Sequence, residues 1–380
     1  MAGGFAASAQ ARRVAPMPAT DDEDRLRFDR VEDWPAPEEQ RWWYGDSAAE
    51  RTLLDAYRSG RMHHAWLLGG PKGIGKATLA FRFARFVLAN PDPGAPAVAA
   101  ATDLSVPKID PAFRKVANRA HPNLLVLERP WDEQYKRFKT VVAVDEIRRT
   151  ISFFGSTGGE DNWRIAVVDP ADDMNDASAN ALLKVLEEPP RRSLFLIVAH
   201  APGRALPTIR SRTRRLDVPL LAPEAIAAAF RDHGEDGVSD ADLALAGQLA
   251  GGSLRRAIGL VEGGGIDTYR DLTKLLARLP EVDVEAMHAF ADGVSGRRAD
   301  DEWTAFADLL SGWLNRRVRG ENEPEATTML SPAARAAPLE RWAEVWEDLR
   351  RSTDLSDEYN LDRKRTVLSV LMSLARATRM

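Results

Sequence analysis

The chain has 380 residues, of which 44% are hydrophobic, and a formal net charge of −5 at pH 7. This length is too great for one compact core of usual size, so we expect two or three domains. The acidic balance predicts no general attraction to nucleic acid, and the absence of cysteine excludes disulfides, thiolate metal sites and a cysteine nucleophile.

The first segment, residues 1–36, is rich in Ala, Pro, Arg and Asp and has no helical or strand periodicity. It predicts a disordered N-terminal tail. It also lacks the apolar stretch of a signal peptide, and no apolar run in the chain approaches the roughly 18 residues of a membrane span. We therefore expect no membrane contact and a cytoplasmic location. Packing is expected to begin among the aromatic residues Trp34, Trp42, Trp43 and Tyr44.

An α/β domain is predicted for residues 37–218, where short apolar runs alternate with amphipathic helical stretches. The stronger runs are almost wholly apolar, as buried parallel strands are. Together with a weaker final run they predict a parallel five-stranded sheet, with strands at 65–68, 124–127, 165–168, 194–199 and 215–218. Residues 90–122 are rich in Pro and Ala and predict a long surface loop with at most one short helix.

The remaining chain shows only helical periodicity. Residues 219–265 predict a small helical unit, with Pro223 at its start and a glycine run at its end. From 266 to 380 the apolar spacing predicts a separate all-helical domain.

A phosphate-binding loop is predicted where the first strand meets the following helix. Residues 69–78 contain Gly70, Gly73, Gly75 and Lys76, and from Gly70 the spacing is G-x-x-x-x-G-K. Glycines allow backbone N–H groups to turn toward phosphate oxygens, while the helix N-terminus and the lysine add positive charge. The alternative is a glycine-rich turn that only connects the strand to the helix.

The catalytic part of this ATP site is incomplete. Ala77 occupies the position where a Ser or Thr hydroxyl would bind Mg²⁺, and Thr78 comes one residue late, about 100° further round the helix. Asp169 follows the third strand as a Walker B aspartate would, but Pro170 replaces the carboxylate that orients water. Because phosphoryl transfer relies on positioning and charge stabilisation, we expect nucleotide binding to be retained and hydrolysis to be lost.

Three segments carry a family resemblance. Residues 180–190 read Asn-Ala-Leu-Leu-Lys-Val-Leu-Glu-Glu-Pro-Pro, residues 206–212 read Leu-Pro-Thr-Ile-Arg-Ser-Arg, and residues 63–66 read His-His-Ala-Trp. They resemble the bacterial DNA polymerase III clamp-loader family, with Thr213 in place of the cysteine of its Ser-Arg-Cys motif. This combination is far more specific than a phosphate loop alone.

The resemblance implies an AAA+ P-loop domain, a helical lid at 219–265 and a collar at 266–380 that holds subunits together. In this family δ, three γ/τ and δ′ subunits form a hetero-pentamer that loads the sliding clamp onto primed DNA. A degenerate ATP site with a retained arginine is the pattern of the δ′ type. Such a chain counts as a subunit of a DNA-directed DNA polymerase holoenzyme, a transferase, yet alone is expected to lack ATPase and polymerase activity.

Two arginines receive roles from this resemblance. Arg212 matches the arginine finger that reaches a neighbour's ATP, and Arg255 matches the sensor 2 arginine that faces the chain's own nucleotide. His200 is the candidate for the polar residue after the fourth strand. No cofactor is required, although ATP or ADP is expected to bind without hydrolysis. No zinc is expected, because the four-cysteine module of some members is missing.

Other interpretations stay open at this point. The arginines could instead form a solvated or DNA-facing basic cluster made of Arg210, Arg212, Arg214 and Arg215. The chain could also be a self-contained AAA+ ATPase of DNA repair or recombination, or a nucleotide-dependent adaptor outside replication. Both the ATPase alternative and a working Mg²⁺ site are disfavoured by Ala77 and Pro170.

Overall fold

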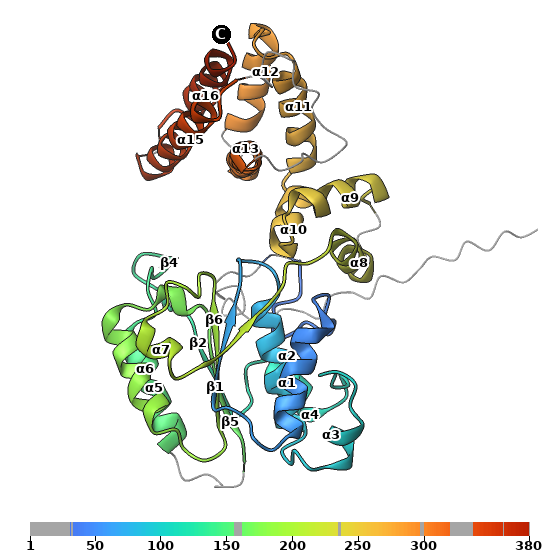
Figure 1. Ribbon diagram of the computed structural model, residues 1–380, viewed down its shortest axis with the longest axis vertical. Coiled ribbons are helices and arrows are strands. Elements are labelled where there is room, and N and C mark those ends of the chain that lie inside the picture. Colours follow the sequence, from blue (N-terminus) through green and yellow to red (C-terminus); the bar gives the residue numbers. More distant parts are fainter. Residues whose placement is uncertain are drawn as a thin grey trace, which may run out of the picture.

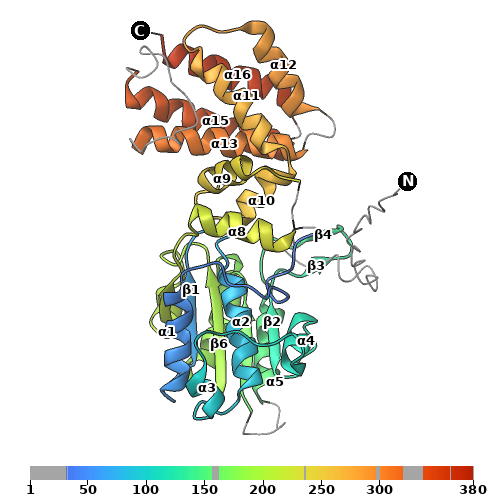
Figure 2. The ribbon, with the colours of Figure 1, turned by 90° about the vertical axis from the view of Figure 1, so that its right-hand side faces the viewer.

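A helical part sits above a P-loop-type α/β part in the computed structural model of the chain (Figures 1 and 2). The structure describes residues 31, 33–155, 162–234, 237–296, 300–319, 337–359 and 361–379. Most of the predicted N-terminal tail, residues 1–30 and 32, lies outside the described residues. Within the described ranges, no helix has the length and apolar character needed to cross a bilayer.

The α/β part is built on a five-stranded parallel sheet, which confirms the predicted fold class. Its strand order is β2-β5-β6-β1-β7. The central strands are buried along nearly their whole length, because helices cover both faces of the sheet. The strands are β1 (Ala65–Gly69), β2 (Leu124–Leu127), β5 (Arg164–Val168), β6 (Ser193–Ala199) and β7 (Arg214–Asp217).

Two separate apolar cores lie on the two faces of this sheet. Alternate side chains of β6 point to opposite faces, so Leu196 belongs to one core and Phe195 to the other. On one face lie α1 (Ser47–Arg58), α2 (Lys76–Ala89), α3 (Pro96–Ala100) and α4 (Pro111–Ala117) (Figure 1). On the other lie α5 (Val144–Gly155), α6 (Asp176–Glu187) and α7 (Pro207–Arg210), with the short 3₁₀ turn Ala171–Asp173 nearby.

The segment predicted as a surface loop, residues 90–122, is folded onto the α/β part instead. It contains two short helices, α3 and α4, each with a proline in its first turn. Val98, Phe113 and Val116 are buried in the core beneath α2. The prediction of at most one helix was wrong because helices this short show no measurable periodicity. A small hairpin, β3 (Trp131–Asp132) with β4 (Arg137–Phe138), follows β2.

The helical part shares one continuous core. Its helices are α8 (Pro223–His233), α9 (Asp240–Leu249), α10 (Leu254–Glu262), α11 (Gly265–Ala277), α12 (Val284–Ser295), α13 (Asp300–Arg319), α15 (Leu339–Tyr359) and α16 (Arg363–Ala377). One buried cluster contains Leu249 and Leu260 of the first three helices together with Phe306 and Leu374 of the later ones. No break in packing therefore marks residue 265, where α10 passes into α11.

Packing begins at Trp34, as the aromatic residues predict, although this residue lies within the segment 1–36 that was predicted as a tail. Trp34 is 5% exposed; it packs edge-on against Phe230 at 5.0 Å and stacks on His233 at 4.2 Å. Its indole Nε1 donates to Glu262 at 2.5 Å. The predicted tail boundary at residue 36 was therefore wrong for residues 33–36. Composition over a window hides one tryptophan, yet a single indole buries enough apolar area to hold a segment down.

The burial of Trp34 generates a stability prediction. We expect Trp34→Ala to lower the free energy of unfolding by about 2–4 kcal/mol, since it removes a buried indole from the core of α8 to α10. The matched control is Trp42→Ala, whose side chain is 44% exposed, and it should change stability by no more than about 0.5 kcal/mol. Urea unfolding followed by circular dichroism measures both. Equal effects of the two substitutions would contradict the anchoring role of Trp34.

Candidate nucleotide-binding site

The parallel sheet brings the candidate site residues to one edge. Strands β5, β6 and β1 are neighbours, and all their carboxyl ends point the same way. Consequently the loop after β1, Asp169 after β5 and His200 after β6 line a single pocket, which Arg255 of α10 also lines. The sequence-predicted residues that meet in this pocket are Gly73, Gly75, Lys76, Ala77, Thr78, Asp169 and Arg255.

The glycines of the loop have conformations and neighbours that a side chain would not tolerate. Gly75 precedes the first residue of α2 with φ +94°, and Gly70 has φ +144°. At Gly73, with φ +80°, an added Cβ would overlap the hydroxyl of Ser253 and lie 2.8 Å from Cβ of Arg255. Gly73 therefore serves two purposes, because it bends the loop and lets α10 approach.

Lys76 reaches into the centre of the loop from the first turn of α2. Its side chain is buried, and Nζ donates to the carbonyl oxygen of Pro71 at 2.5 Å. Burial lowers the pKa of the Lys76 amine to about 8, against the opposing effect of Asp169 and Asp172. A buried cation surrounded by inward-turning glycines is a suitable ligand for phosphate oxygens.

The residues fit phosphate but not a catalytic Mg²⁺ site. Ala77 lines the pocket with a methyl group where a metal-binding hydroxyl is needed, and Thr78 follows it along the helix. Asp172, the other nearby carboxylate, is committed elsewhere, since it accepts hydrogen bonds from the backbone N–H groups of His200 and Ala201 at 2.5 and 2.8 Å. Asp169, after β5, is the carboxylate of the Walker B-like position that lines the pocket.

Arg255 enters the pocket from the helical part. Ser253 caps α10 by accepting from the backbone N–H of Arg256, which fixes the helix start. The backbone N–H of Arg255 donates to the carbonyl oxygen of Gly73 at 3.4 Å. The start of α10 therefore contacts the phosphate loop directly, and Arg255 lies where it can face a ligand of that loop.

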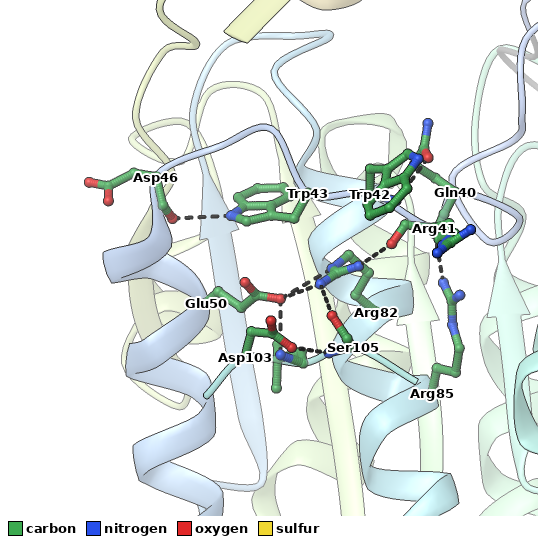
Figure 3. Close-up of polar contacts among 11 residues, drawn as sticks. Gln40, Arg41, Trp42, Trp43, Asp46, Glu50, Arg82, Arg85, Asp103 and Ser105 are labelled. Carbon is green, nitrogen blue, oxygen red and sulfur yellow. Dashed lines mark hydrogen bonds and ion pairs between the residues drawn. The ribbon is translucent and has the colours of Figure 1, made fainter. Parts of the chain in front are cut away.

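A segment that sequence reasoning did not assign to the site forms another wall of the pocket. We call residues 34–46 the strap; it runs from the core of α8 to α10 across the pocket to the start of α1. The Trp43 ring lies over Gly75, and an added Cβ on that glycine would sit 3.2 Å from it. The Trp43 indole donates to the carbonyl oxygen of Asp46 at 3.1 Å (Figure 3).

Two buried arginines of α2 hold the strap in place. Arg82 forms an ion pair with Glu50 of α1 at 2.6 Å and also donates to the carbonyl oxygen of Arg41 (Figure 3). Arg85 donates to the carbonyl oxygen of Gln40 at 3.0 Å. Both side chains are almost fully buried, and burial lowers the pKa of Arg85 to about 10. The only sequence signal for this arrangement is the presence of two arginines in an otherwise apolar helix.

Glu38 provides a third attachment of the strap. Its fully buried carboxylate accepts from Nε of Arg119 at 2.6 Å, and Arg119 also pairs with Glu128, after β2, at 2.6 Å. The Tyr44 hydroxyl lies 3.1 Å from Asp232 of α8. The strap thus connects the sheet, α2 and the helical part on the pocket side of the molecule.

Arg212 lies outside this pocket. It follows the four-residue helix α7, just before the edge strand β7, and its side chain is 35% exposed. One guanidinium nitrogen lies 2.9 Å from Glu187 of α6, and another donates to the carbonyl oxygen of Thr208 at 3.1 Å. Among the pocket-lining residues in the described part of the chain Arg212 does not occur. In the described part of the chain, the guanidinium contacts α6 and the segment around α7.

Comparisons with known proteins agree with the resemblance in the sequence. The family model described as DNA polymerase III, delta subunit, matches residues 45–222. DNA polymerase III subunit delta′ of Pseudomonas aeruginosa is 35% identical over 188 residues, which are 48% of this chain and 52% of that protein. The delta′ subunit of Escherichia coli is 29% identical over 328 residues, or 84% and 92% of the two chains. By these comparisons the chain is similar to DNA polymerase III delta′ subunits over its α/β part, and at lower identity over most of its length.

Gamma/tau subunits are also among the similar proteins. DNA polymerase III subunit gamma/tau of Mycobacterium tuberculosis is 29% identical over 277 residues, which are 70% of this chain and 45% of that protein. The chain thus spans about half the length of the first curated relatives that it matches.

Solved structures with a similar arrangement come from Thermotoga maritima. A gamma subunit-related protein of DNA polymerase III has 15% sequence identity and a TM-score of 0.40, with 86% of this chain and 99% of that chain covered. A RuvB variant has 15% identity and a TM-score of 0.41, with coverages of 82% and 90%.

The depressed pKa of Lys76 predicts a specific pH dependence of stability. Between pH 8 and the ordinary lysine pKa near 10.4, the unfolded chain binds this proton and the folded chain does not. The contribution of Lys76 to stability therefore rises with pH across this window. We expect wild type to gain about 2 kcal/mol relative to Lys76→Met between pH 7.5 and 10 in urea unfolding. Parallel curves for the two proteins would show that the amine is not desolvated.

Proposed function

We propose that this chain is a δ′-type subunit of a DNA polymerase III clamp loader. In this role it assembles with γ/τ and δ subunits and helps to load the sliding clamp onto primed DNA. It contributes Arg212 to the ATP site of a neighbouring subunit and does not hydrolyse ATP itself. The helices from α11 onward act as the collar of the assembly, and the α/β part carries the arginine to the interface.

One observation carries this proposal. Arg212 lies between α7 and β7 with a partly exposed side chain, and it is not among the described residues that line its own phosphate-loop pocket. A guanidinium remains charged at any working pH, and its planar fork matches phosphate oxygens. A partly exposed arginine outside the chain's own pocket is suited to serve another subunit's nucleotide.

The chain's own site supports a binding role without turnover. The glycine loop and Lys76 remain suited to phosphate, and Arg255 faces them from α10. However, Ala77 offers no ligand to Mg²⁺, and Pro170 offers no carboxylate to an attacking water. Bound ATP or ADP would then stabilise the contact between α10 and the phosphate loop, and this contact would not open and close with hydrolysis.

The finger assignment is tested in a complex in which Arg212 is the only source of such an arginine. This chain is co-purified with a γ/τ-type subunit that carries alanine at its own corresponding arginine, and ATPase is measured with primed DNA and clamp. We expect Arg212→Ala to lower the remaining turnover by roughly 10³-fold or more, since fingers contribute about that much. The matched control is Arg210→Ala, which removes an exposed arginine of the same segment and should leave kcat within about two-fold.

The two outcomes separate the finger from the basic-cluster alternative. Equal, modest losses that shrink at higher salt would identify the arginines as a general basic surface. Full activity of a properly assembled Arg212→Ala complex would contradict the finger.

The absence of intrinsic turnover has its own test. The purified chain is expected to bind ATP without hydrolysing it above the background of Lys76→Ala, because the metal ligand is missing at Ala77. Brisk turnover by the isolated chain that Lys76→Ala abolishes would support a self-contained ATPase instead.

A further inference from the structure

The carboxylate of Glu187 is the charged partner of Arg212. It lies 2.9 Å from a terminal nitrogen of the guanidinium, and the two side chains are 52% and 35% exposed. Glu187 belongs to α6 and Arg212 follows α7, which packs beside α6 (Figure 1). The pair therefore connects the end of one helix to the segment that carries the finger.

Glu187 is poorly placed for the stability of its own helix. It is the last residue of α6, where the helix dipole favours a cation over a carboxylate. The following Pro189 and Pro190 prevent the helix from continuing, so the position of Glu187 is fixed by the chain. Since Glu187 is unfavourable for its own helix but pairs with Arg212, its role is best explained by its effect on the position of Arg212.

A second contact holds the same guanidinium from below. The other terminal nitrogen donates to the carbonyl oxygen of Thr208 at 3.1 Å and to the hydroxyl of Ser211 at 3.3 Å. The Arg212 backbone N–H donates to Ile209 at 3.1 Å, as does the Thr213 hydroxyl, which fixes the turn after α7. The guanidinium thus contacts Glu187, Thr208 and Ser211. A guanidinium has five N–H donors, so donors remain for phosphate oxygens.

We propose that Glu187 is a positioning residue for Arg212, an inference that rests on the finger role proposed above. The ion pair selects the side-chain conformation in which the guanidinium leaves the surface toward the neighbouring subunit. An unrestrained arginine samples many rotamers, and ordering it during the reaction slows the chemical step. Glu187 removes most of this disorder before the neighbour's ATP reacts.

The experiment uses the complex in which Arg212 is the only finger. Glu187→Gln removes the charge at nearly constant shape, and Glu187→Asp keeps the charge on a shorter side chain. The matched control is Glu188→Gln, which changes the adjacent exposed carboxylate, for which no ion pair is seen in the described part of the chain. ATPase is measured as a function of ATP concentration, so that kcat and KM are obtained separately.

We expect Glu187→Gln to lower kcat about two- to five-fold with KM for ATP unchanged, which is the range for an exposed ion pair. Glu187→Asp should recover part of this loss, and Glu188→Gln should have no effect. In the Arg212→Ala background, Glu187→Gln should cause no further decrease, because a positioning residue acts only through its arginine.

Three results would overturn this inference. They are an unchanged kcat for Glu187→Gln, an increase in kcat that would make Glu187 a restraint, and an equal further loss in the Arg212→Ala background. The failure of the finger itself is recognised separately, since Arg212→Ala alone would then leave turnover intact. Thermal unfolding of each variant confirms that all compared chains are folded.

Discussion

The parallel register of β5, β6 and β1 is the constraint on which the site depends. It places the phosphate loop, Asp169 and His200 at one edge of the sheet, although they are far apart in the sequence. The same register sends the chain after β6 through α7 to the edge strand β7. Arg212 lies between α7 and β7, outside the described lining of the pocket that Lys76 occupies. Under the proposed function, the same sheet carries the loop for the chain's own ligand and the arginine for a neighbour's ligand.

Around this sheet, buried ion pairs and hydrogen bonds hold the walls of the pocket in place, although no hydrolysis is proposed for it. Arg82, Arg85 and Glu38 hold the strap across the phosphate loop, and Trp34 attaches its first residues to α8. The close approach of Gly73 and Ser253 joins the loop to α10. The core continues from α10 into the later helices. The contact between the phosphate loop and α10 therefore connects the sheet to the proposed collar through packed helices. Such rigidity would suit the proposed presentation of Arg212 to a neighbouring subunit.

The sequence predicts the strands, the phosphate loop and the missing metal ligand because each depends on local pattern. The run 194–199 is apolar on both of its sides, as is typical of a strand buried on both faces of a sheet. Ala77 has no side-chain oxygen, so it cannot bind Mg²⁺ in any surroundings. The strap could not be predicted, since its partners Arg82 and Arg85 reach buried backbone carbonyls that no periodicity reveals. Helices α3 and α4 are too short to show a period. The pairing of Glu187 with Arg212 depends on how α6 packs beside α7, which is tertiary information.

The proposed function depends on the direction of the Arg212 guanidinium in the assembled complex. The most direct measurement is a cryo-EM structure of the complete complex with a non-hydrolysable ATP analogue, primed DNA and clamp. The account predicts that the Arg212 guanidinium lies about 3 Å from the terminal phosphate oxygens of the analogue in the adjacent subunit. A map in which Arg212 faces solvent or DNA, away from every bound nucleotide, would contradict it.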